Sequence, residues 1–225
     1  MKRGDSVDRV EANRRRFAEA VGVSVNDMVR AHQVHGTGVA KVDWDDAGQW
    51  RDGVDCLITD TVGLPLGLVF ADCVPILLYD PRRHALGVCH AGWRGTVNGA
   101  AAATLWAMQA AFDTVPADVR ACIGPSIGPE SYEVGPEVVA MAHAKLTDAE
   151  RFFHRPAEAE AETNLHFDLW QANSSQLADA GVPRHQIEIA ELDTALNTAD
   201  FFSHRAERGQ CGLFGLLAWL TPTEF

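Results

Sequence analysis

The segment spanning residues 67–95 constrains the fold of this chain more than any other stretch, because it holds apolar runs of strand length separated by polar turns. It reads GLVFADCVPILLYDPRRHALGVCHAGWRG. The apolar runs at 66–70, 74–79 and 85–89 predict buried strands. Cys73 precedes one run and His90 follows another, so both lie where strands meet loops, and functional side chains collect at such places. We therefore expect a functional site at these strand ends.

Size and charge limit the kind of protein this can be. A chain of 225 residues with 47% hydrophobic residues can bury the core of a single domain. The net charge is −12, and the basic cluster Arg14-Arg15-Arg16 is expected on the solvated face of a helix. We therefore expect the protein to bind neither nucleic acid nor an anionic membrane. The sequence shows neither an apolar signal segment nor an apolar run long enough to span a membrane, so we expect a cytoplasmic protein. We also expect a monomer that acts on small molecules.

The order of the expected elements favours an α+β or mixed α/β fold, with mixed sheets and flanking helices in a single domain. Helices are expected at residues 6–22, 96–112, 136–145 and 168–180. Strands are expected at 28–34, 39–42, 56–60, 119–123, 186–190, 201–205 and 213–220, besides those of the central segment. Residues 42–54 predict an exposed loop, 124–129 a rigid Gly/Pro loop, and 147–162 a polar insertion.

The five cysteines show no C-x-x-C spacing, which argues against a disulfide framework. A functional cysteine in this chain is therefore expected to be a metal ligand or a nucleophile. We expect Cys56, Cys89 and Cys211 in the core, and Cys122 as a small buried residue.

Two histidines and a cysteine form a possible metal site. His35, Cys73 and His90 offer two imidazoles and a thiolate, the ligand set of a zinc ion that keeps a fourth position open for water. His32 and His35 lie three residues apart, so a strand directs at most one of them to a given site, and His35 is nearer the predicted bend. The residues alone leave two alternatives open: three unrelated side chains, or a Cys73 nucleophile with His90 as its base.

Four sequence blocks resemble one known family. They are Q-V-H-G at 33–36, D-C-V-P-I-L-L-Y-D-P at 72–81, H-A-G-W-R-G at 90–95 and I-G-P-S-I-G-P-E-S-Y-E-V-G at 123–135. Together they resemble the multicopper polyphenol oxidase, or laccase-domain, family, over residues 4–220. The resemblance implies zinc on His35, Cys73 and His90. It also implies phosphorolysis of adenosine, inosine and methylthioadenosine, with adenosine deamination as a side activity.

Chemistry of this kind suggests roles for two further residues. Asp72 is a candidate proton carrier for deamination, and Arg94, near a predicted helix N-terminus, is a candidate phosphate ligand. The structural alternatives are a carboxylate that accepts backbone N–H bonds and a loop clamp. Nine histidines without any His-x-His pair argue against multicopper oxidase chemistry, although copper can bind such a site adventitiously.

The chain departs from the family pattern in three places. The family has a strand segment before the first helix, and here that segment is expected to be missing. Asp193-Thr194 replaces Cys-Thr, and Ala206 and Leu213 stand where the family has arginines. These departures keep two other functions open: a cysteine hydrolase or deamidase using Cys73 and His90, and a non-catalytic nucleoside- or metal-binding protein.

Overall fold

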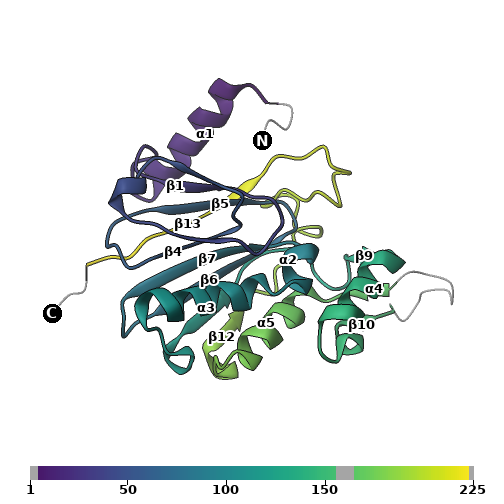
Figure 1. The fold of residues 1–225 in the computed structure, drawn as a ribbon. Helices are drawn as coiled ribbons and strands as arrows, with labels where there is room; N and C mark the ends of the chain where they lie inside the picture. The colour runs from purple at the N-terminus through teal and green to yellow at the C-terminus, as the bar shows by residue number, and fades with distance from the viewer. Residues whose placement is uncertain (1–4, 156–164, 223–225) are drawn as a thin grey trace.

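Two large stacked β-sheets with helices on their outer faces, together with one small sheet, make up the protein (Figure 1). The computed structural model describes residues 5–155 and 165–222. Helix α1 (Val7–Ala20) lies over the four-stranded sheet, and helices α3 (Ala100–Phe112) and α5 (Leu169–Asp179) lie against the six-stranded sheet. The expected mixed sheets with flanking helices in a single domain are confirmed.

The helices begin and end at recognisable signals. Ser6 caps α1, because its hydroxyl accepts a hydrogen bond from the backbone N–H of Arg9, and the Asp168 carboxylate caps α5 in the same way through Gln171. None of the helices in the described part of the chain is long and apolar enough to cross a membrane. The described α-helices are α1 (Val7–Ala20), α2 (Trp93–Val97), α3 (Ala100–Phe112), α4 (Pro136–Lys145) and α5 (Leu169–Asp179). The described 3-10 helices are η1 (Trp44–Asp46), η2 (Pro116–Asp118), η3 (Ala149–Phe152) and η4 (Arg184–Gln186).

The strands form three sheets. A four-stranded sheet has the order β13-β5-β1-β3, with β13 (Phe214–Ala218), β5 (Leu66–Phe70), β1 (Val29–His32) and β3 (Trp50–Asp52). A six-stranded sheet has the order β12-β8-β6-β7-β4-β2, with β12 (Ile187–Ile189), β8 (Arg120–Ile123), β6 (Val74–Asp80), β7 (Ala85–Ala91), β4 (Cys56–Thr59) and β2 (Val39–Lys41). A small sheet has the order β10-β11-β9, with β10 (Phe153–His154), β11 (Leu165–Phe167) and β9 (Glu133–Val134).

The central strands β4, β6 and β7 of the six-stranded sheet are buried on both faces, which explains why they read as nearly continuous apolar runs. On β4, Leu57 faces the apolar layer between the two large sheets, whereas Ile58 faces the layer under the helices. On β7, Val88 and Cys89 alternate between the same two layers. This alternation fixes the direction of every side chain at the ends of these strands.

The central hairpin sets the register of the site. Strands β6 and β7 pair antiparallel from Val74 opposite Ala91 to Asp80 opposite Ala85. The buried Asp80 carboxylate closes the turn, because it accepts hydrogen bonds from the backbone N–H groups of Arg82 and Arg83.

Two of the expected elements were wrong. Residues 201–205 form no strand: the Glu207 carboxylate and the Ser203 carbonyl and hydroxyl take up local N–H groups, which produces a series of turns. The helix expected at 96–112 is two helices, since Gly99 adopts a left-handed conformation (φ 83°) between α2 and α3.

The segment 42–54 also differs from the expected loop. It contains η1 and β3, and β3 pairs with β1 in parallel, Arg30 opposite Trp50. Strand β3 has the polar sequence Trp-Arg-Asp, so its backbone pairing with β1, and not an apolar pattern, determines its conformation. The described part of the expected insertion 147–162 holds η3 and β10, and residues 156–162 lie outside the described residues.

Truncating a central strand residue tests this packing. Ile76 on β6 is fully buried, so Ile76→Ala leaves a cavity and is expected to lower the free energy of unfolding by about 2–5 kcal/mol. The control Leu196→Ala, at a side chain that is 73% exposed, is expected to stay within about 0.5 kcal/mol. Urea unfolding of both variants measures the difference, and equal midpoints would contradict the assigned core.

Candidate metal centre

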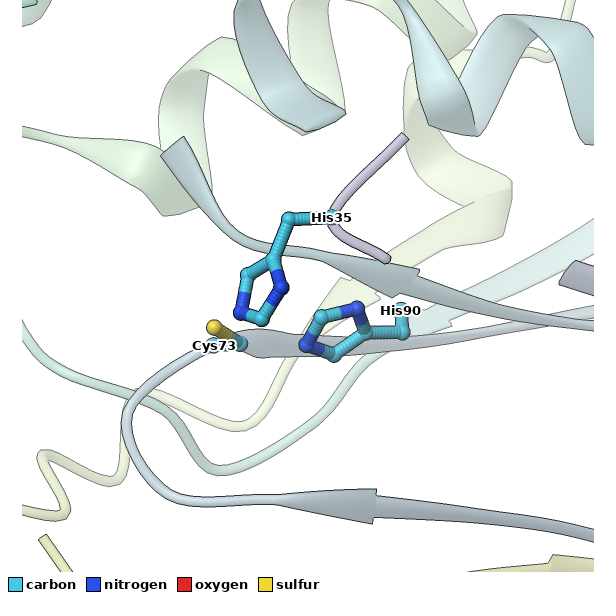
Figure 2. Close-up of side chains that lie close together, drawn as sticks. All are labelled: His35, Cys73 and His90. Carbon is cyan, nitrogen blue, oxygen red and sulfur yellow. The ribbon is translucent and has the colours of Figure 1, made fainter. Parts of the chain in front are cut away.

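Three potential metal ligands from three separate segments converge at one end of the central sheet (Figure 2). His35 lies in the loop after β1, Cys73 immediately precedes β6, and His90 is the penultimate residue of β7. One nitrogen of each imidazole and the Cys73 Sγ all lie within 4.8 Å of one another. In the part of the chain that the structure describes, this is the one group of three or more such residues close enough to share an ion.

The buried carboxylate of Asp55 holds two of these ligands in place. Its Oδ1 accepts hydrogen bonds from the backbone N–H of His35 (2.9 Å) and from Nδ1–H of His90 (2.8 Å). Its Oδ2 accepts from the backbone N–H of Gly36 (2.7 Å) and of Val34 (3.2 Å). The bond to Nδ1 orients the His90 ring and leaves Nε2 as its free ligand nitrogen.

Asp55 is 0% exposed, so these bonds decide its charge state. Burial alone would raise the pKa of its carboxyl group, but the hydrogen bonds from His90, Gly36 and His35 outweigh burial and lower the pKa. The ionised carboxylate thereby keeps all four acceptor contacts. A negative charge behind His90 also makes the ring a better metal ligand.

Cys73 and His90 influence each other's protonation. Burial raises the pKa of the Cys73 thiol, but hydrogen bonds and positive charge from His35 and His90 outweigh it and lower the pKa to about 6. Burial lowers the pKa of His90, but Asp55 and Cys73 outweigh it and raise the pKa to about 9. The metal-free site therefore favours a Cys73 thiolate, which is the form that binds metals or attacks carbonyl groups.

Close packing at the site explains a glycine in the block at 90–95. A Cβ atom on Gly92 would lie 2.9 Å from the Cys73 Sγ and 3.1 Å from Cδ2 of His35. Both distances are too short for ordinary contacts, so a larger residue there would displace two of the three potential ligands.

The structure places Asp72 beside the site, in a role that matches its structural alternative. Its carboxylate is 8% exposed and accepts hydrogen bonds from the Thr194 hydroxyl (2.7 Å) and the backbone N–H of Arg205 (2.6 Å). Its carbonyl accepts from the backbone N–H of Ile127 (3.0 Å). Asp72 thus ties the loop that carries Cys73 to the Gly/Pro loop and to the segment between β12 and β13.

Arg94 occupies a different position from the one expected. Helix α2 begins at Trp93, so Arg94 lies inside its first turn and not ahead of a helix starting at residue 96. Its guanidinium group lies over the Trp93 ring, 4.2 Å from the centroid. The side chain is exposed and does not line the cavity beside the three ligands.

A cavity of about 250 Å³ opens beside the three ligands. Its far end is formed by Trp50, with Arg14 from α1 5.1 Å from the indole centroid and His32 stacked on the ring at 4.5 Å. Arg14 is therefore not on a purely solvated face as expected. His32 contacts Asp52 and not the ligand cluster, which agrees with only one of His32 and His35 reaching the site.

A larger cavity of about 460 Å³ lies elsewhere, along α3 and α5. It contains none of the three ligands, so ligand chemistry and not volume identifies the candidate site. Cys122, expected to be buried, is exposed and lines a third, mostly apolar cavity of about 320 Å³. Cys56, Cys89 and Cys211 are buried as expected.

Sequence reasoning missed several residues around the site. Asp55 is the most important of them, and its signal is an acidic residue directly before the buried strand β4. Tyr132 is a second such residue: burial and the nearby Cys73 raise the pKa of its phenol group, and the Arg205 guanidinium lies 5.2 Å from the centroid of the Tyr132 ring. The Asp193 carboxylate accepts a hydrogen bond from the Ser131 hydroxyl (2.6 Å).

The donor set fits a transition-metal ion. Two imidazoles and one thiolate, with a carboxylate behind one imidazole, match the ligand types and the supporting contact of zinc sites. The same donors also bind copper, which has the higher intrinsic affinity for nitrogen and sulfur ligands. The geometry thus supports a mononuclear metal centre and leaves the element open.

Comparison with known proteins extends across almost the whole chain. The model of the family described as multi-copper polyphenol oxidoreductase laccase matches residues 1–221. "Purine nucleoside phosphorylase YlmD" from Geobacillus stearothermophilus is 38% identical over 216 residues, covering 93% of this chain and 78% of the relative. "Adenosine deaminase RL5" from an unknown prokaryotic organism is 37% identical over 212 residues, covering 90% and 78%.

The fold has a close counterpart among solved structures. The crystal structure of the hypothetical protein YfiH from Bacillus licheniformis superimposes with a TM-score of 0.90 at 33% sequence identity. The match covers 98% of this chain and 84% of that one.

Replacing the Asp55 carboxylate tests its part in the site. Asp55→Asn turns one acceptor oxygen into a donor NH₂ group that faces backbone N–H groups, so we expect metal affinity to fall about 10–100-fold. Competition with a chromophoric chelator measures this affinity. The matched control is Asp52→Asn, which changes an exposed carboxylate against the exposed His32 and should leave the affinity unchanged. Equal affinities of both variants would contradict the role of Asp55.

Proposed function

The chain belongs to the multi-copper polyphenol oxidoreductase laccase family, and from this premise we propose that it is a zinc-dependent purine nucleoside phosphorylase with adenosine deaminase side activity. Adenosine, inosine and methylthioadenosine are its proposed nucleoside substrates, and phosphate is the second substrate. The observation that carries the proposal is the convergence of His35, Cys73 and His90 within 4.8 Å beside a cavity of about 250 Å³. One relative that is named as a purine nucleoside phosphorylase and another that is named as an adenosine deaminase support it.

His35, Cys73 and His90 would hold the ion, with Asp55 behind His90. When bound, zinc supplies a Lewis acid that polarises an oxygen and lowers the pKa of water. Because the His90 pKa is raised to about 9 in the metal-free protein, binding at neutral pH has to displace the proton on its ligand nitrogen.

The cavity would receive the nucleoside between the ligand cluster and the Trp50 indole. His32 already stacks on that indole ring, so Trp50 closes the far end of the cavity, and His32 and Arg14 offer hydrogen-bonding groups there. In phosphorolysis a phosphate oxygen bonds to the anomeric carbon of the ribose while the bond from this carbon to the base breaks. In deamination water replaces the amino group of the base, and ammonia leaves.

Two residues complete the proposed chemistry. Arg94 is proposed to hold phosphate through its guanidinium group, and in this role it would leave its contact with the Trp93 ring and turn toward the cavity, which it does not line in this structure. Asp72 is proposed to carry a proton during deamination. Both Asp72 oxygens already accept hydrogen bonds, so in this role it would exchange the Thr194 or Arg205 contact for one to the substrate.

One observation favours a second candidate function, a cysteine hydrolase or deamidase. The lowered pKa of Cys73, with a hydrogen bond to His90, matches a nucleophile paired with a general acid. The two functions differ in the state of the sulfur. A metal-bound thiolate resists alkylation until a chelator removes the ion, whereas a free nucleophile reacts at once.

Metal content and turnover measured on the same preparations test the proposed function. We expect about one zinc per chain and phosphate-dependent release of hypoxanthine from inosine, followed by chromatography. His90→Ala is expected to lose both the metal and the turnover, because only two ligands remain. Iodoacetamide is expected to modify Cys73 only after chelation.

The control is His143→Ala, which removes an imidazole on α4 outside the ligand cluster and should keep both metal and activity. A metal-free wild-type protein whose Cys73 is alkylated immediately would overturn the zinc assignment and support the hydrolase. A zinc-loaded protein without turnover of any purine nucleoside would leave the binding protein as the function.

The phosphate role of Arg94 has its own test. A charge-assisted hydrogen bond contributes about 1.5–3 kcal/mol, so Arg94→Ala should raise the KM for phosphate about tenfold or more. Zinc content and the deamination of adenosine, which needs no phosphate, should not change. Arg82→Ala is the control, because Arg82 is exposed and pairs with Asp118 at the opposite end of the central hairpin. An unchanged KM for phosphate would rule out the role.

A further inference from the structure

Two cysteines that the proposed chemistry does not use lie directly opposite each other beneath the metal centre. Cys56 on β4 pairs with Cys89 on β7 in the antiparallel register of these strands. Both side chains are fully buried. They are thus a defined pair and not two isolated core residues.

The backbone hydrogen bonds identify the kind of pair. The N–H of His90 donates to the carbonyl of Asp55, one position along the ladder, while the N–H of Cys56 points away from β7 and donates to the carbonyl of Gly38. Cys56 and Cys89 therefore form a non-hydrogen-bonded pair. In such pairs the Cα atoms are about 4.5 Å apart and the side chains approach most closely.

This spacing is compatible with a covalent bond between the sulfurs. Disulfides require Cα atoms about 4.4–6.8 Å apart and side chains that project in the same direction. Both cysteines contribute to the apolar layer between the six-stranded sheet and its helices, so they project to the same face of the sheet. Closing the bond requires no strand to change its register.

The pair lies one residue from the two groups that organise the metal site. Asp55 precedes Cys56, and His90 follows Cys89. Because side chains alternate along a strand, the thiols lie on the helix side of the sheet and the Asp55–His90 contact lies on the other side. If closing the bond changes the separation of β4 and β7 at the thiols, the adjacent Asp55–His90 hydrogen bond changes with it.

We propose that Cys56 and Cys89 form a cross-strand redox pair that closes to a disulfide and weakens metal binding at His35, Cys73 and His90. The oxidant is a low-molecular-weight disulfide such as oxidised glutathione. One thiolate attacks it, forms a mixed disulfide and releases one glutathione thiolate. The second cysteine sulfur then attacks the mixed disulfide, the Cys56–Cys89 bond forms, and a second glutathione leaves. The two cysteines lose two electrons and two protons, and the oxidant is reduced to two thiols.

The covalent bond and its effect on the metal are separate parts of the proposal. The bond depends only on the register of β4 and β7. The effect on metal binding rests on the proposed function, because it needs His35, Cys73 and His90 to hold zinc. The experiment reads the two parts separately.

The bond is tested by mapping disulfides in the metal-free full-length protein. Because both thiols are buried, oxidant reaches them in the native state only through local opening, so the reduced protein is both incubated natively and refolded from urea in glutathione redox buffers. Free thiols are then alkylated, and peptides are analysed by mass spectrometry. We expect a Cys56–Cys89 peptide pair that has lost two hydrogen atoms, in a protein with native circular dichroism.

Two variants provide the controls. Cys122→Ser removes an exposed cysteine and should leave the Cys56–Cys89 peptide pair unchanged. Cys56→Ala should abolish the pair and leave Cys89 open to alkylation on unfolding. If both thiols of the wild-type protein remain alkylatable after refolding in oxidised glutathione, or if the bond forms only in a chain that has lost its fold, the redox pair is refuted.

The effect on the metal is measured on the oxidised and reduced wild-type proteins. Zinc affinity, determined by competition with a chromophoric chelator, should be about tenfold weaker in the oxidised form. Equal affinities of the two forms would refute the coupling while the mapped bond stands. A reduced protein that binds no zinc would instead refute the proposed function, and the peptide map would still decide whether the bond forms.

Discussion

The Asp55 carboxylate is the contact on which the candidate site depends. An ionised carboxylate without partners is expensive to bury, and this one is stable because three backbone N–H groups and the His90 ring donate to it. The same four bonds fix the loop that carries His35 and the orientation of His90. Folding of this region and assembly of the two imidazoles are therefore one event, since neither imidazole can be placed without satisfying the buried charge.

The third ligand is placed by strand register. Because Pro75 lies opposite His90 in the β6–β7 hairpin, Cys73 emerges from the sheet just beyond the pair that holds His90. The absence of a Cβ on Gly92 lets the Cys73 Sγ and the His35 ring approach the same point. Asp72 then fixes the Cys73 loop from outside, through Thr194, Arg205 and Ile127. Sheet geometry sets the approximate position of the sulfur, and the loop contacts refine it.

The extent to which sequence predicted this structure follows from where the apolar pattern is strong. The runs at 66–70, 74–79 and 85–89 are buried on both faces, and each became a strand whose end carries, or adjoins, a site residue. The apolar pattern predicts nothing where hydrogen bonds decide the conformation, as in the short polar strand β3 and in the turns at 201–205. The sequence predicts a solvated face for Arg14 because the indole partner of Arg14, Trp50, comes from a segment that the pattern predicts as a loop. Asp55 was missed because a single acidic residue carries no periodicity.

The surroundings of Cys73 favour a metal ligand over a nucleophile. A catalytic thiol needs one base and an open path for the substrate carbonyl to reach its sulfur. Here the sulfur lines the cavity, but two imidazoles and not one share it. Holding the His35 imidazole at this position costs free energy, because His35 adopts a left-handed backbone conformation (φ 62°) that Asp55 must stabilise. A hydrolase would gain little from that arrangement, whereas a metal ion needs the third donor to be retained. The strained His35 is therefore the residue that best separates the two functions on physical grounds.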